Sequence, residues 1–228
     1  MDTNRVISGI AFIIIFALTL FASSNGVQWR CDNPMISSYL YIILAYVSIW
    51  MFSANITTMY SSGIIVSMIG VFILLFALLF TPAQYFWTKH LIFLAYLFCF
   101  AYILKPSLDN SPNLVQNIIF ASGLFITLTI FSNIFMDKIN MSWEKYLLMI
   151  LVGMIIIYIY GAFTGGFSQQ NIRRLAILGV VVFSMFILVD TKRLRMTDCL
   201  ENPDYINNIM GLFLDGLNLF SNIQTINQ

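Results

Sequence analysis

The chain has 228 residues, of which 60% are hydrophobic and only 9% are charged, and its formal net charge is +1. In soluble domains about a quarter of the residues are charged. A chain this apolar has more hydrophobic surface than one soluble core can bury. The sequence has no basic block and no alternation of basic and aromatic residues, which argues against nucleic acid as a partner. The composition predicts an integral membrane protein whose first partner is the lipid bilayer.

The apolar residues form long runs that do not alternate as the strands of a membrane barrel do, so we expect an all-α, multi-pass fold. In chain order the runs predict about eight membrane-spanning helices, at residues 6–22, 36–52, 62–80, 91–104, 114–136, 146–164, 175–189 and 204–223. Residues 6–22 are followed by small residues that are also typical of a signal peptide, but we interpret them as a first helix.

Several local signals predict where these helices begin and end. Prolines and polar residues indicate a loop at 105–112, and Gly165-Gly166 follow the helix expected at 146–164. Asn202-Pro203 combine a capping side chain with a proline, which is typical of a helix start, and they precede the last expected helix.

Loop charges predict the orientation of the helices in the membrane. With eight spans, the loops after the first, third, fifth and seventh spans share one side, and they carry seven of the eleven basic residues. The positive-inside rule assigns that side to the cytoplasm. Both termini are therefore predicted to be non-cytoplasmic.

The last expected helix carries a carboxyl group, Asp215, near its middle. A charged carboxylate at the bilayer centre costs at least about 2.5–3.5 kcal/mol, so such residues face protein or water and are functional candidates. Residues spaced three or four apart place Asp215 on one polar, small-residue stripe of the helix. The other members of this stripe, and our candidates for lining a pore, are Asn208, Gly211, Asn218 and Asn222.

A second aspartate, Asp190, closes the preceding expected helix, and a loop of about a dozen residues joins the two helices. We therefore expect the helices to be antiparallel neighbours. Two neighbouring carboxylates in a low-dielectric setting cannot both ionise cheaply, so the pair is expected to share a proton. Such a pair can sense pH or, when deprotonated, supply oxygen ligands to Ca²⁺. Taken alone, Asp190 is also consistent with an interfacial residue beside Lys192 and Arg193, and Asp215 with a buried residue satisfied by Asn or Ser neighbours.

The sequence shows no sign of an enzyme and predicts no cofactor. It has no His/Glu zinc constellation, no nucleophile elbow and no phosphate-binding loop. Its single histidine, His90, and its three isolated cysteines lack metal-ligand spacing. Buried carboxylates would also serve a proton-coupled transporter, so that alternative stays open.

Two segments near the C-terminus carry a more specific pattern. The run Val189-Asp190-Thr191-Lys192 is followed about twenty-five residues later by Leu212-Phe-Leu-Asp215-Gly-Leu-Asn218-Leu-Phe220. These motifs resemble the closing signature of the Bax-inhibitor family (TMBIM, transmembrane Bax inhibitor motif), in which "YDT" ends the sixth helix and "LYLDxxNLF" fills the seventh. Residues 137–142 are similar to the family's loop between its fourth and fifth helices. The chain is thus identified as a divergent member of that family.

The resemblance implies a seven-helix bundle over residues 35–228 and leaves residues 1–34 as an additional N-terminal transmembrane segment and loop. It also implies a Ca²⁺-permeable leak pathway gated by Asp190 and Asp215, with Ca²⁺ and H⁺ as its ions and other membrane proteins as partners. We expect an endomembrane such as the ER or Golgi, or a viral membrane derived from it.

Two departures from the family pattern separate two hypotheses. Some members balance the aspartate pair with an arginine in the second family helix, whereas residues 62–80 contain no charge, and Val189 replaces the usual tyrosine. The first hypothesis is a pH-sensitive Ca²⁺ leak channel that regulates cell death. The alternative is a non-conducting structural or partner-binding membrane protein, for example of a virion or a membrane complex, and the missing arginine and the additional first span favour it.

Overall fold

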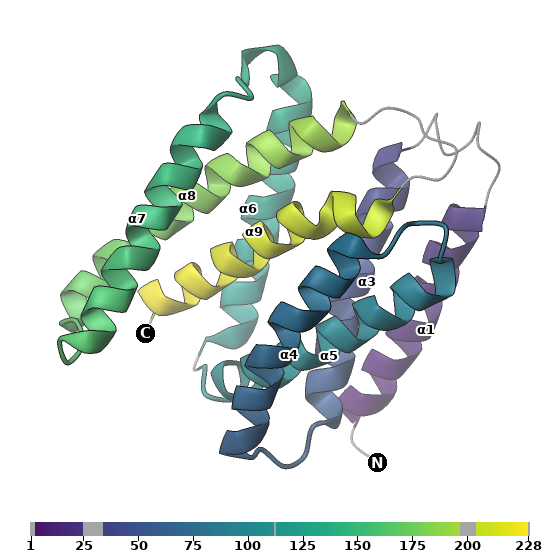
Figure 1. Ribbon diagram of the computed structural model, residues 1–228, viewed down its shortest axis with the longest axis horizontal. Coiled ribbons are helices and arrows are strands. Elements are labelled where there is room, and N and C mark those ends of the chain that lie inside the picture. The colour runs from purple at the N-terminus through teal and green to yellow at the C-terminus, as the bar shows by residue number, and fades with distance from the viewer. Residues whose placement is uncertain (1–2, 25–33, 112, 197–203, 228) are drawn as a thin grey trace. The chain divides into compact units, whose positions relative to one another are not determined.

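The computed structural model describes residues 3–24, 34–111, 113–196 and 204–227. In these ranges the chain forms eight long helices, one short 3-10 helix and no strand (Figure 1), which confirms the predicted all-α fold. The elements are α1 (Thr3–Ser24), α3 (Pro34–Asn55), α4 (Ser61–Phe80), α5 (Phe86–Asp109), α6 (Leu114–Ile134), η1 (Met136–Lys138), α7 (Trp143–Phe163), α8 (Gln169–Arg195) and α9 (Tyr205–Ile226).

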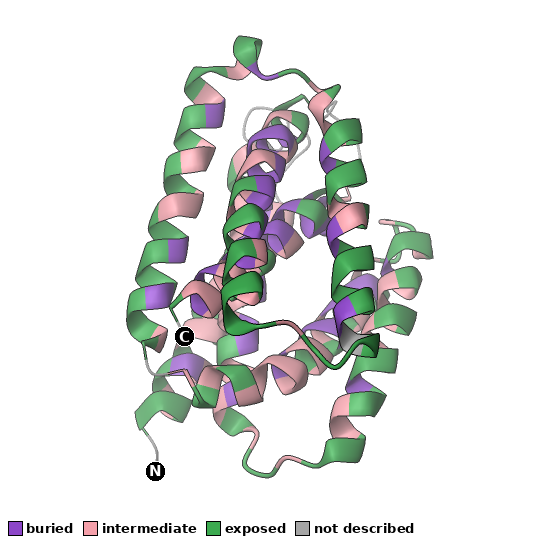
Figure 2. Ribbon diagram, turned by 90° about the vertical axis from the view of Figure 1, so that its left-hand side faces the viewer, coloured by how far each residue is buried: buried purple, intermediate pink, exposed green. Residues whose placement is uncertain are grey.

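Seven of these helices, α1 and α3 to α8, are long and apolar enough to cross a membrane. The eighth, α9, is not among them, because Asp215 and four asparagines interrupt its apolar residues. Each of the seven helices has large hydrophobic side chains that are exposed, as expected where lipid surrounds a helix instead of water. Figure 2 marks exposed residues in green along the helices. The fold is that of a multi-pass membrane protein.

Helix α8 is longer than its apolar run, and the prediction of a helix at 175–189 was too short at both ends. Asp190 lies inside α8 and not at its end, because the helix continues to Arg195. The last turn carries Lys192, Arg193 and Arg195, and positive charges are favourable at a helix C-terminus. The helix therefore extends more than one turn beyond the end of the apolar run.

Helix α5 also runs further than expected, and the loop predicted at 105–112 was wrong over its first residues. The helix passes through Pro106 and ends at Asp109. A proline removes one backbone hydrogen bond, but two side-chain contacts support this last turn. Lys105 forms an ion pair with Asp109 at 2.7 Å, and Asn110 Nδ2 donates to the Pro106 carbonyl at 2.8 Å.

The turn between α7 and α8 confirms the helix end predicted at the two glycines. Gly165 and Gly166 have φ of 89° and 96°, a region that side chains other than glycine rarely enter. The Gly166 N–H donates to the Gly161 carbonyl at 2.8 Å, which closes α7 as a Schellman motif. Ser168 then caps α8 by accepting from the Asn171 N–H at 3.4 Å.

The predicted start of the last helix at Asn202-Pro203 lies outside the described residues. The cap that the structure shows is Asp204, whose Oδ1 accepts from the Asn207 N–H at 3.1 Å. A carboxylate in this position satisfies a free N–H and interacts favourably with the helix dipole.

The chain divides into two compact units. The first comprises Met1–Asn110 and Asp198–Met210, and the second comprises Ser111–Thr197 and Gly211–Gln228. The first six residues of α9 thus belong to the first unit and the remainder to the second. Our division of the sequence at residue 34 stays a prediction.

In the first unit, α1 packs on α3, α3 on α5 and α5 on α4. A polar network is buried among the apolar side chains of this unit. The Tyr41 hydroxyl lies 2.9 Å from Ser23 Oγ and 2.7 Å from His90 Nε2, and His90 Nδ1 donates to the Phe86 carbonyl at 2.7 Å. Beside it, Lys89 Nζ forms an ion pair with Asp204 at 2.5 Å.

In the second unit, α6 and α7 both pack on α8. Ser132 Oγ of α6 donates to the Leu188 carbonyl of α8 at 2.8 Å, a polar contact typical of neighbouring membrane helices. Lys192 Nζ donates to the Ile139 carbonyl at 2.7 Å and so ties the end of α8 to the connection between α6 and α7. These contacts hold the helix that carries Asp190.

Candidate functional site

Two close contacts set the register of α8 against the part of α9 in the second unit. A Cβ at Gly179 of α8 would overlap the side-chain amide of Asn222, and a Cβ at Gly211 of α9 would overlap Asp190 Oδ2. The two contacts are eleven residues apart on both helices, from Gly179 to Asp190 and from Gly211 to Asn222. Eleven residues correspond to about three helical turns, so the helices run antiparallel in one register over that length. The expected antiparallel neighbours are confirmed.

This register brings Asp190 and Asp215 together. Asp215 is 8% exposed, and the side chain of Asp190 is 14% exposed. The two carboxyl groups lie close enough to interact directly. Two carboxylates this close in a low-dielectric environment cannot both ionise cheaply, so a single negative charge on the pair is favoured.

The environment of Asp215 offers little compensation for a negative charge. Within the described part of the chain, no N–H or hydroxyl group donates to Asp215 Oδ2, although this oxygen is buried. A buried carboxylate without donors is costly, and a second negative charge beside it raises that cost. The pair therefore holds one negative charge far more easily than two.

Gly211 is the residue that permits this approach. Its Cα faces Asp190 Oδ2 so closely that any larger residue would displace the carboxyl group. Gly211 was predicted to line a pore as part of the polar stripe, and the structure places it against Asp190.

The remaining candidates on the stripe are the three asparagines. Asn208 and Asn218 are exposed, and Asn222 is half-buried. Asn218 Nδ2 donates to the Leu214 carbonyl at 2.9 Å and Asn222 Nδ2 to the Asn218 carbonyl at 2.7 Å, so both amides bind the backbone of α9 itself. Their role in lining a pore stays a prediction.

Two charged residues at this site were not proposed from the sequence. Arg193 Nη1 lies 3.4 Å from Asp190 Oδ1, and the same guanidinium forms an ion pair with Glu144 at the start of α7. The spacing of Asp190 and Arg193, three residues apart on a helix, is a signal that the sequence did contain. Glu144 lies 49 residues from Arg193, and no local pattern indicates that contact.

Comparison with known protein families gives a match over nearly the whole chain. The family model described as "Inhibitor of apoptosis-promoting Bax1" matches residues 10–227. The chain belongs to the Bax inhibitor family. The match includes both aspartates and most of α1, and it confirms the resemblance inferred from the two C-terminal motifs. No curated protein and no solved structure was found to match the chain.

Membership of the Bax inhibitor family and the seven apolar helices together identify an integral, multi-pass membrane protein. Two residues of the C-terminal motifs, Asp190 and Asp215, are brought close together by α8 and α9. Among the described residues, no group of three or more His, Cys, Asp or Glu side chains converges as a metal site would require.

Proposed function

We propose that this Bax inhibitor protein is a pH-sensitive Ca²⁺ leak channel that regulates cell death, with Asp190 and Asp215 as its gate. The observation that supports the proposal is the buried contact between the two carboxyl groups, because such a pair favours one negative charge over two. A contact that exists only in one protonation state is suited to a pH-dependent gate, because its loss changes the interaction between two helices.

The proposed mechanism follows from the charges. With one proton on the pair, the carboxyl groups are bonded and α8 and α9 stay in contact at Gly211. When that proton leaves, two like charges at contact distance repel strongly in a low-dielectric environment. The helices then separate locally or admit water, and both changes open a polar path along this face of α9.

The same carboxylates would interact with Ca²⁺ as the permeating ion. Ca²⁺ takes six to eight oxygen ligands, whereas two carboxylates supply at most four. The permeating ion would therefore keep part of its water shell at the pair. Incomplete coordination favours passage, because an ion that binds too tightly does not leave.

The decisive experiment measures Ca²⁺ flux into proteoliposomes from about pH 5 to about pH 8. We expect pH-dependent flux in the wild type, and we expect Asp215→Asn to abolish this dependence by fixing the pair in one charge state. Asp137→Asn, which removes an exposed carboxylate in η1, is the matched control and should behave as wild type. Equal flux at every pH in the wild type and Asp215→Asn would overturn the gate.

One observation favours a second candidate function. Helix α4, which corresponds to the family helix that carries an arginine in some members, contains no charged side chain. A chain without that arginine could retain the fold as a non-conducting membrane scaffold. Absence of flux in all variants, together with stoichiometric co-purification of partner proteins, would support this function instead.

A further inference from the structure

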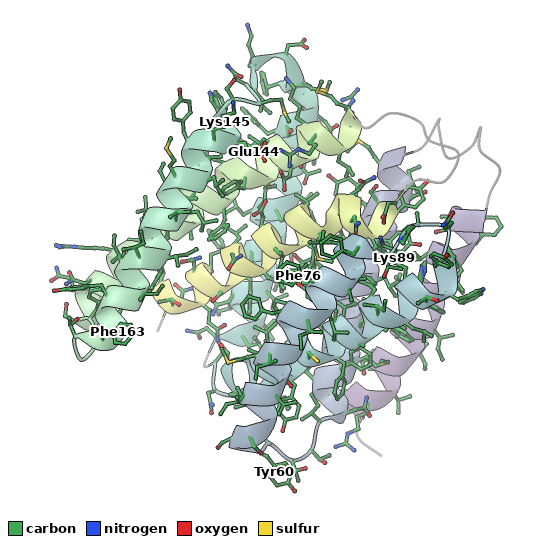
Figure 3. All side chains as sticks on the ribbon, in the orientation of Figure 1. Tyr60, Phe76, Lys89, Glu144, Lys145 and Phe163 are labelled. Atoms are coloured by element: carbon green, nitrogen blue, oxygen red, sulfur yellow. The ribbon has the colours of Figure 1, made fainter. Side chains whose placement is uncertain are left out.

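Arg193 lies between two carboxyl groups that come from different helices. Its Nη1 faces Asp190 Oδ1 at 3.4 Å within α8, and its Nη2 is paired with Glu144 of α7. Glu144 is labelled at the start of α7 in Figure 3. Because Asp190 also contacts Asp215, four ionisable groups from α7, α8 and α9 form one continuous chain.

We propose that Arg193 is a positioning residue that supplies the positive charge for the aspartate pair, and that Glu144 controls this charge by competing for the same guanidinium. The inference rests on the proposed function for its consequence for gating. Its direct effect is on the protonation of the carboxyl pair, which can be measured without any flux.

Among the described residues, the other charged groups on α6 to α9 bind elsewhere or are exposed. Lys192 Nζ donates to the Ile139 carbonyl, and Arg195 Nη1 donates to the carbonyl and the side-chain oxygen of Asn133. Lys145 on α7 is exposed. Helix α6 has no charged residue, and Asp215 is the one charged residue of α9. Within the described ranges, the only ion pair that reaches either aspartate is that of Arg193.

The geometry allows the guanidinium of Arg193 to pair with either Asp190 or Glu144. The distance of 3.4 Å to Asp190 is at the long limit of a hydrogen bond, and the other terminal nitrogen of the same guanidinium is paired with Glu144. The side chain of Arg193 is 48% exposed, so it can move toward either carboxylate by changing its rotamer while α8 stays in place. Glu144 therefore holds a charge that the aspartate pair would otherwise attract.

If Glu144 competes with the aspartate pair for Arg193, loss of Arg193 and loss of Glu144 should change the protonation of the pair in opposite directions. Loss of Arg193 removes a positive charge, so the pair should keep its proton to higher pH. Loss of Glu144 frees the guanidinium for Asp190 and removes a negative charge, so the pair should release its proton at lower pH. If the Arg193–Glu144 ion pair served only stability, loss of either partner would have the same effect on the protonation of the aspartate pair.

The test is infrared difference spectroscopy of the purified full chain in lipid nanodiscs, titrated across pH. The carbonyl band of the protonated pair is assigned by its loss in Asp215→Asn. We expect the midpoint of this band to move up by about half a unit to one unit in Arg193→Gln, and down by a similar amount in Glu144→Gln. Arg195→Gln removes a neighbouring arginine that binds Asn133 and, among the described residues, no carboxylate, and it should move the midpoint least.

Shifts in the same direction, or shifts no larger than that of Arg195→Gln, would overturn the inference. Arg193→Lys keeps the charge and should restore most of the wild-type midpoint, which separates loss of charge from loss of folding. Flux is measured on the same preparations. Opposite midpoint shifts without flux would refute the proposed gate and leave the role of Arg193 intact, whereas flux with unmoved midpoints would refute this inference alone.

Discussion

Two aspartates of the C-terminal region, Asp204 and Asp215, differ in the partners that surround their carboxyl groups. Asp204, in the first unit, uses both oxygens: Oδ2 pairs with Lys89 at 2.5 Å, and Oδ1 caps α9. Lys89 in turn donates to the Thr81 carbonyl at 2.7 Å. Asp215, in the second unit, is buried beside another carboxyl group, and in the described residues no donor reaches its Oδ2.

The two carboxyl groups therefore lead to different expectations. A charge with hydrogen-bonded partners on both sides ties together the elements that carry those partners, and its loss is costly. A buried carboxyl with an oxygen that no donor reaches adds little to stability, and under the proposed function its role depends on a change of charge. Substitutions in the first unit should therefore reduce stability, and those at the aspartate pair should change function.

The largest effect on stability is expected from Lys89→Met. The substitution leaves Asp204 without its counter-ion, and a broken buried pair costs about 3 kcal/mol of unfolding free energy. The measurement is reversible unfolding in mixed micelles. Lys105→Met is the control, because its partner Asp109 is 53% exposed and the change should cost no more than about 0.5 kcal/mol. Equal losses of unfolding free energy in Lys89→Met and Lys105→Met would contradict the expected difference between the buried and the exposed ion pair.

A smaller loss is expected from Tyr41→Phe, which removes the hydroxyl between Ser23 and His90. Removal of one buried partner leaves the others to find new hydrogen bonds, and it costs about 1–2 kcal/mol. Tyr60→Phe, on an exposed ring, should leave the unfolding free energy unchanged within error. If Ca²⁺ flux changed in Tyr41→Phe while stability did not, the network would have a role beyond structure.

The smallest change in stability is expected from Gly211→Ala in the second unit. Alanine favours the helix by about 1 kcal/mol, but its Cβ must displace the Asp190 carboxyl, so the two effects nearly cancel. The pH dependence of flux should nevertheless change, because the aspartate pair moves. Gly153→Ala, with open space around its Cβ, should stabilise the protein slightly and leave flux as in wild type. A normal pH profile in Gly211→Ala would show that the close contact is not needed for gating.

The sequence by itself determined the helical membrane fold, the number of long helices and the two aspartates of the site. These features are local: an apolar run long enough to span a bilayer has no alternative to a helix, and the family motifs are short and contiguous. The helix ends were less well predicted, because α5 and α8 continue through residues whose side chains find partners that hydropathy does not show.

Only the tertiary structure decided which charges the aspartates meet. Lys89 and Asp204 are separated by 115 residues, and Arg193 and Glu144 by 49. Such pairs depend on the register of one helix against another, which close contacts such as that between Gly211 and Asp190 set. The residues of these two long-range pairs carry no local sign of their partner, whereas the spacing of Asp190 and Arg193 does. The sequence therefore identified Asp215 as an unusual carboxyl group in an apolar helix, and the packing of α7, α8 and α9 determined which charged residues lie near it.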